Sequence, residues 1–94
     1  MDKKKLYNEI ADFLKTKGAI KVAVFGSYVR DEETSNSDID VITEFSDDMS
    51  LMKFVRIQRE LSEYIGIKVD LLTEENISPY FKDDVKNQMI VLYN

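Results

Sequence analysis

Apolar side chains recur at helical spacing in two segments of the chain, with polar and charged residues between them. The first segment predicts an amphipathic helix from Lys3 to about Lys15, with Asp2 as its N-cap and Gly18 just beyond its end. The second segment predicts a longer helix from Met49 to about Tyr64, ended by Gly66. The face of this longer helix that we expect to be buried carries Leu51, Phe54, Val55, Gln58, Leu61 and Ile65.

Three short apolar runs have the length and composition of β-strands, at about residues 20–25, 38–45 and 67–72. Residues 28–30 are expected to form one helical turn before a polar loop. Ser78-Pro79 is typical of a helix start, so a third helix is predicted from there to about Asn87, with a short closing strand over 89–93. This order predicts a single α/β (α+β) domain in which helices pack on a small mixed sheet.

The chain contains no cysteine and no histidine, and this composition restricts its chemistry. Disulfides, thiolate or imidazole metal ligands and a Ser-His triad are excluded. The formal net charge of −5 argues against non-specific binding to nucleic acid or to an anionic membrane. The apolar runs are too short to span a bilayer, so we expect a cytoplasmic protein with one domain over residues 1–94.

The first candidate for a binding site is Gly26-Ser27, which ends an apolar strand. A glycine at this place lets a ligand or another backbone approach closely, and the amides that follow can surround an anion. The serine hydroxyl adds a donor for a phosphate oxygen. The alternative interpretation is an ordinary strand-ending turn.

The second candidate is Asp38-Ile39-Asp40, at the start of the next predicted strand. Residues two apart on a strand point to the same face, so Asp38 and Asp40 would lie close enough to share a cation. Mg²⁺ is bound in proteins through one or two such carboxylates. The alternative is a solvated acidic strand end, which the apolar neighbours of Asp40 make less favourable.

The third candidate is Asp70, a single carboxylate within the apolar strand at 67–72. If this strand lies beside the one at 38–45, Asp70 can face the same patch as Asp38 and Asp40. Three carboxylates in one patch can hold two divalent ions for displacement at phosphorus. Alternatively, Asp70 is paired with Lys68 or Lys21.

Four of these residues occur at a diagnostic spacing, because ten residues separate Gly26-Ser27 from Asp38-x-Asp40. This Gly-Ser-x10-Asp-x-Asp pattern resembles the signature of the DNA polymerase β-like nucleotidyltransferase superfamily. The resemblance extends from Lys21 to Leu72 and implies the catalytic palm of that superfamily. Over its whole length the chain is similar to the minimal nucleotidyltransferases, the small MntA-type antitoxins that pair with HEPN-domain toxins.

The resemblance implies a role for each matching residue. Gly26 and Ser27 would hold the phosphates of a nucleoside triphosphate. Asp38 and Asp40 would bind two Mg²⁺ ions, and Asp70 would bind the catalytic ion and help deprotonate the attacking hydroxyl. Phosphoryl transfer of this kind relies on positioning and charge neutralisation, so it needs neither histidine nor cysteine.

The segment after the Gly-Ser turn departs from the family pattern. Tyr28-Val29-Arg30 stands where a small-residue helical turn with arginine is common, and Arg30 is expected either to contact phosphate or to be a solvated surface residue. The loop from Asp31 to Ser37 is acidic where family members are often basic or contain glycine. This departure bears on how strongly the loop can be expected to bind phosphate.

The resemblance implies an antitoxin that transfers AMP from ATP, with Mg²⁺, to a hydroxyl of a HEPN toxin, in the type VII HEPN/MNT toxin–antitoxin class, with a tyrosine as the acceptor. A palm that occupies nearly all 94 residues leaves no subdomain for an acceptor, so a second chain should supply it. The first alternative is a binding module that neutralises its partner by contact alone. The second is a transferase that modifies small molecules, although enzymes of that kind carry an extra domain.

Overall fold

The computed structural model describes residues 2–77 and 82–94. Helix α1 spans Lys3–Thr16, and the Asp2 carboxylate accepts a hydrogen bond from the backbone N–H of Lys5, as predicted for an N-cap. Helix α2 spans Leu51–Ile65 and ends at Gly66, whose φ of 72° places it in the left-handed region. None of the helices in these two ranges is both long enough and apolar enough to cross a membrane.

A four-stranded sheet forms the centre of the molecule, in the order β3-β2-β1-β4. Strands β1 (Ala19–Phe25) and β2 (Ile39–Phe45) are antiparallel, and β4 (Ile90–Tyr93) is antiparallel to β1. Strand β3 (Val69–Leu72) is parallel to β2, because α2 forms the connection between them. The predicted mixed sheet and closing strand are confirmed.

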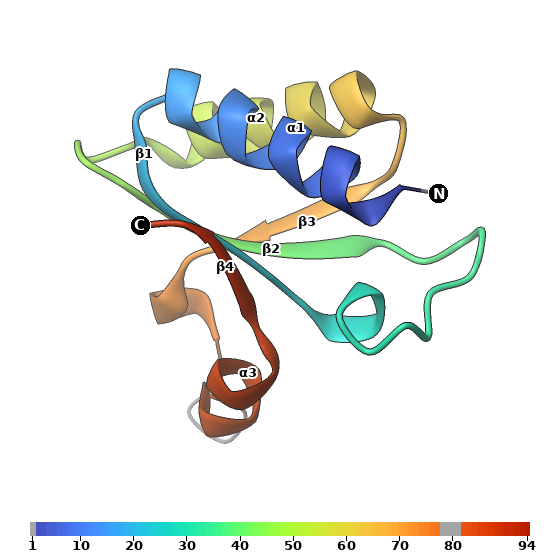
Figure 1. Cartoon of the computed structure of the whole chain (residues 1–94). Coiled ribbons are helices and arrows are strands. Elements are labelled where there is room, and N and C mark those ends of the chain that lie inside the picture. Colours follow the sequence, from blue (N-terminus) through green and yellow to red (C-terminus); the bar gives the residue numbers. More distant parts are fainter. Residues whose placement is uncertain (1, 78–81) are drawn as a thin grey trace.

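The two long helices cover one face of the sheet, and α3 (Lys82–Gln88) lies on the other side together with the short helical turn η2 (Glu74–Asn76) (Figure 1). The covered face forms the apolar core, in which α1, α2 and the inward side chains of the strands meet. Its fully buried members include Ile10, Leu14, Val22, Val24, Ile39, Val41 and Leu61.

The predicted buried face of α2 is wrong at two positions. Leu51 is 77% exposed and Val55 is 51% exposed, whereas Ile57, which the pattern did not select, is 3% exposed. Hydrogen bonds to the edge strand explain the rotation of the helix. The Gln58 side chain accepts from the backbone N–H of Leu71 at 2.9 Å, and the Ser62 hydroxyl accepts from Val69, so this side of α2 must face β3.

The turn after β1 begins earlier than the sequence predicts. It is a 3₁₀ turn, η1, over Gly26–Tyr28 rather than a helical turn over residues 28–30. A 3₁₀ turn is favoured because the N–H of Val29 reaches back to the carbonyl of Gly26 at 3.1 Å. The predicted helix start at Ser78-Pro79 lies outside the described residues, and α3 is the described part of that helix.

Candidate active site

Side chains of the two parallel strands, β2 and β3, alternate between the faces of the sheet. In β2, Ile39 and Val41 belong to the core beneath the helices, and Asp40 lies between them on the opposite, open face. In β3, Val69 and Leu71 are buried in the same core, and Asp70 is exposed. The strand period therefore directs both carboxylates to the face that α1 and α2 leave uncovered.

The strand register places these two carboxylates next to each other. Asp40 of β2 is the direct partner of Asp70 of β3, which puts their backbones about 4.8 Å apart. The alternative pairing of Asp70 with a lysine is not what the structure shows. Lys68 lies 3.8 Å from the Asp38 carboxylate, and Lys21 lies 2.7 Å from Glu74.

The pKa of Asp40 reflects its burial and the closeness of these carboxylates. Burial and, to a smaller extent, the negative charges of Asp70 and Asp38 together raise the pKa of Asp40 from 3.8 to about 6. The positive charge of Arg30 opposes the shift. The three other charged residues predicted for the site, Asp38, Asp70 and Arg30, are therefore close enough to influence this carboxyl, and two of the three are negative.

The Gly-Ser turn lies directly against Asp40. Gly26 has a φ of 83°, a left-handed conformation that glycine adopts without strain. A Cβ added to Gly26 would collide with Oδ2 of Asp40, so only glycine leaves room for that carboxylate. Ser27 follows in η1, whose backbone is closed by a hydrogen bond from the N–H of Glu32 to the Ser27 carbonyl at 2.9 Å.

Arg30 leaves the turn toward the open face. Its guanidinium donates to Glu32 and to the Gln88 side chain of α3, both at 3.2 Å, and it is half exposed. These contacts hold the cation near Asp40 while part of it stays accessible. The structure thus distinguishes Arg30 from a freely solvated surface arginine.

The carboxylates are neighbours, yet they do not form a ready-made metal site. Among the residues that the structure describes, no three acidic side chains converge closely enough to hold an ion. Asp38 precedes β2, and its carboxylate lies 3.8 Å from the Lys68 ammonium.

A cleft of about 480 Å³ opens beside the Gly-Ser turn, and sequence reasoning did not predict it. Phe25 and Leu72, on the open face of β1 and β3, supply its apolar floor together with Ile77 and Val85. Gly26 and Arg30 also line it, so the cleft is continuous with the turn. Its walls come from two segments more than forty residues apart, which only the folded chain brings together. The residues that complete the rim are Asn76, Asp84 and Gln88.

Comparison with known proteins identifies close relatives over almost the entire chain. The sequence is 36% identical to a candidate protein adenylyltransferase of Methanocaldococcus jannaschii over 91 residues, 95% of this chain and 93% of the relative. It is 32% identical to the protein adenylyltransferase MntA of Thermococcus cleftensis over 73 residues, 78% of this chain and 74% of the relative.

Solved structures share the fold. A candidate minimal nucleotidyltransferase matches with a TM-score of 0.78 at 29% identity, over 96% of this chain and 95% of that one. A toxin–antitoxin structure with AMP-PNP gives a TM-score of 0.82 at 23% identity, over 94% and 73% of the two chains. A complex of tri-AMPylated Shewanella oneidensis HEPN toxin with MNT antitoxin gives a TM-score of 0.76 at 20% identity. The match covers 97% of this chain and 71% of that one.

The family model described as the nucleotidyltransferase domain matches residues 7–92. That range contains the Gly-Ser turn and the carboxylates of the open face. The chain therefore belongs to the nucleotidyltransferase domain family, is an enzyme of that class, and has the fold of the minimal nucleotidyltransferases.

Proposed function

We propose that this protein transfers AMP from ATP to a hydroxyl group of a partner protein, with Mg²⁺ as its cofactor. The observation that carries the proposal is the pair Asp40 and Asp70 on the open face, with the turn at Gly26 against Asp40. Two adjacent half-buried or exposed carboxylates repel each other, and nothing in a structural role calls for that arrangement. A bound cation that also binds the phosphates of a nucleotide would relieve this repulsion.

The turn and the neighbouring cleft account for nucleotide binding. The amides after Gly26 and the hydroxyl of Ser27 would donate to the phosphates, and Arg30 would add a charge-assisted contact. The apolar floor formed by Phe25 and Leu72 suits the flat face of a nucleobase. Gly26 both lines the cleft and lies against Asp40, so the α-phosphate of a nucleotide in the cleft would lie near Asp40.

The donor set fits Mg²⁺. Asp38, Asp40 and Asp70 offer hard carboxylate oxygens, and a bound cation would offset the burial and the negative charges that raise the pKa of Asp40. These three residues would hold two ions after their side chains rotate toward each other. When bound, Mg²⁺ neutralises the triphosphate and the charge that develops during displacement.

The reaction follows from this arrangement. The acceptor oxygen forms a bond to the α-phosphorus, the bond from that phosphorus to the bridging oxygen breaks, and pyrophosphate leaves. Asp70, on the edge strand β3, would take the hydroxyl proton as the acceptor approaches, and its exposure supports this role.

A HEPN toxin is the partner that we propose, with a tyrosine as the acceptor and the antitoxin role as the outcome. Supporting observations are the relatives named as protein adenylyltransferases and the AMPylated HEPN toxin bound to an MNT antitoxin of the same fold. A cytoplasmic location and one domain over residues 1–94 remain predictions.

The second candidate is an antitoxin that neutralises its partner by contact without turnover. The lack of a convergent set of three acidic side chains in the described residues is the observation that favours it. The two candidates differ in their response to Asp40→Asn, since neutralisation of the partner by contact survives this change and neutralisation by AMP transfer does not.

The test is label transfer from ATP to protein in an extract of the source cells with Mg²⁺. Parallel reactions carry the label on the α- or the γ-phosphate, with wild type, Asp38→Asn, or the exposed control Asp48→Asn. A protein band labelled only from the α position, lost in Asp38→Asn and kept in Asp48→Asn, is expected. Mass spectrometry of the band then identifies the acceptor. Label from the γ position, or equal transfer by Asp38→Asn, would contradict the proposal.

A further inference from the structure

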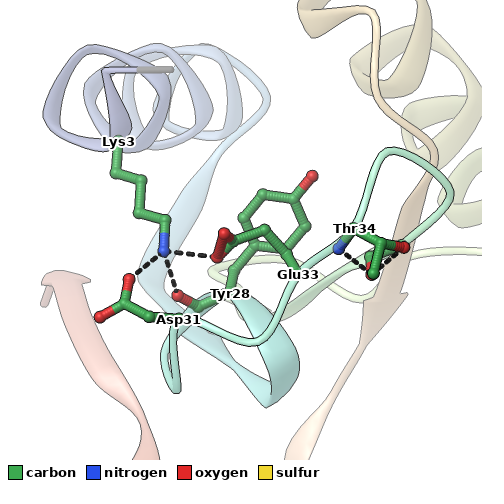
Figure 2. Close-up of polar contacts among 6 residues, drawn as sticks. Lys3, Tyr28, Asp31, Glu33 and Thr34 are labelled. Carbon is green, nitrogen blue, oxygen red and sulfur yellow. Dashed lines mark hydrogen bonds and ion pairs between the residues drawn. The ribbon is translucent and has the colours of Figure 1, made fainter.

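Lys3, the first residue of α1, is bound to the loop that joins the Gly-Ser turn to Asp38 (Figure 2). Its ammonium donates to the backbone carbonyl of Tyr28 at 2.9 Å and to the carboxylate of Asp31, and it forms an ion pair with Glu33. One side chain thus contacts the loop at three places, about 25 to 30 residues away along the chain.

Local preference does not account for a lysine in this position. The first turn of a helix carries a partial positive charge, so a cation there is unfavourable. Lys4 and Lys5 are exposed, whereas the Lys3 side chain is 27% exposed. The contacts of Lys3 with a distant loop compensate for this unfavourable charge, and the helix itself offers no such compensation.

The bound loop turns sharply where Lys3 holds it. Asp31 has a φ of 56°, in the left-handed region that aspartate adopts more readily than most residues with a Cβ. This conformation reverses the chain directly after Arg30. Because Lys3 binds Tyr28 on one side of Arg30 and Asp31 on the other, it fixes the direction in which Arg30 leaves the turn.

Local hydrogen bonds close the remainder of the loop up to the candidate ligand Asp38. The Ser37 hydroxyl accepts from the N–H of Thr34 at 2.8 Å, and the N–H of Ser37 donates to the Thr34 carbonyl at 3.1 Å. This closed turn is followed at once by Asp38. A short segment closed by its own hydrogen bonds therefore connects Glu33 to Asp38.

The positive charge of Lys3 balances the negative charges of the loop beside it. Hydrogen bonds to Asp31 and Glu33 raise the pKa of Lys3, and burial raises the pKa of the neighbouring Tyr7 and Tyr28, which stay neutral. Lys3 is thus the cation that faces two carboxylates, of which Glu33 is mostly buried. Removing its charge leaves Asp31 and Glu33 to repel each other within one loop.

We propose that Lys3 is a positioning residue, which locks the loop over residues 29–38 against α1 and so places Arg30 and Asp38 for nucleotide binding. The inference rests on the proposed function of that site. Lys3 itself touches neither the turn amides nor the carboxylates of the open face, so it acts through the loop.

The experiment compares Lys3→Met, Lys3→Arg and the matched control Lys4→Met, each in the full chain and below its melting temperature. The probe is AMP-PNP with Mg²⁺, titrated calorimetrically, together with amide hydrogen exchange. Lys3→Met should weaken AMP-PNP binding about tenfold and speed exchange selectively over residues 29–38. Lys3→Arg should restore most of the affinity, because a guanidinium can bind both carboxylates. Lys4→Met should resemble wild type.

Unchanged affinity in folded Lys3→Met, or faster exchange spread evenly over α1 and the sheet, would overturn the proposal in favour of a general stabilising role. Failure of the wild type to bind AMP-PNP would instead contradict the proposed function. In that case selective exchange over residues 29–38 still decides whether Lys3 locks the loop.

Discussion

The two faces of the sheet carry different kinds of side chain. On the face beneath α1 and α2, Val22, Val41 and Leu71 are buried against each other and against the helices. On the open face, the same strands place Asp40 beside Asp70. Adjacent residues of one strand, such as Asp70 and Leu71, therefore differ in their effect. The apolar side chains of the covered face stabilise the fold, whereas the adjacent carboxylates of the open face reduce its stability.

This difference shows where functional residues can be sought in a small domain. Asp40, whose pKa is raised, lies beside a second carboxylate on two strands that are otherwise largely apolar, and this arrangement has no structural benefit, so its presence indicates a ligand. The apolar residues of the covered face need no such explanation, because burial accounts for them.

The largest expected effect on stability comes from the covered face. Leu71→Ala should lower the free energy of unfolding by about 2–5 kcal/mol, because it removes a side chain that is 3% exposed and leaves a cavity. Its strand neighbour Asp70→Asn should cause no loss. Urea denaturation at neutral pH measures both. Equal destabilisation by the two changes would abolish the distinction between the faces.

Gly26→Ala should have the next largest effect, and Gly66→Ala is its matched control. Both glycines have positive φ, 83° and 72°, so alanine costs about 1 kcal/mol at either position. Only at Gly26 does the added Cβ also collide with Asp40, since nothing lies near a Cβ at Gly66. Gly26→Ala should therefore be more destabilising by about 1 kcal/mol or more in thermal or urea unfolding. Equal losses would show that the turn does not abut the carboxylate.

The smallest effect is the pH dependence of stability. The pKa of Asp40 is about 6 in the folded protein and 3.8 when unperturbed, so the folded state binds this proton more tightly. The resulting stability is present at low pH and is lost as the pH rises through about 6. Relative to wild type, Asp40→Asn should thus gain about 1 kcal/mol by pH ~8 and little near pH ~4, after allowance for solvent screening.

Urea denaturation across this pH range measures the gain, with the exposed Asp48→Asn as the control. A gain for Asp40→Asn that is independent of pH, or the same trend in Asp48→Asn, would contradict the electrostatic account of the open face.

Local patterns in the sequence predicted most of the fold. Caps at Asp2 and Gly66 and the strand compositions gave the element order and the mixed sheet. The rotation of α2 was missed, because Leu51 and Val55 fit a helical period as well as Ile57 does. The hydrogen bonds of Gln58 and Ser62 to β3 select between the two rotations, and they exist only once the strand is in place.

The candidate site was predictable where its residues share a short motif or a strand pattern. Gly26, Asp40 and Asp70 stand out because each breaks an apolar run. The cleft beside the turn and the contacts of Lys3 were not predictable, since both depend on segments far apart in sequence. Lys3 in particular resembles an ordinary solvated helix start until the loop is packed beside it.

The most direct test of the central claim measures activity and stability of Asp40→Asn on one preparation at pH ~8. The account predicts that AMP transfer from α-labelled ATP falls by at least about a hundredfold while the free energy of unfolding is unchanged or higher. Transfer that survives, or activity and stability that fall together, would contradict the claim that Asp40 is kept on the open face for nucleotidyl transfer.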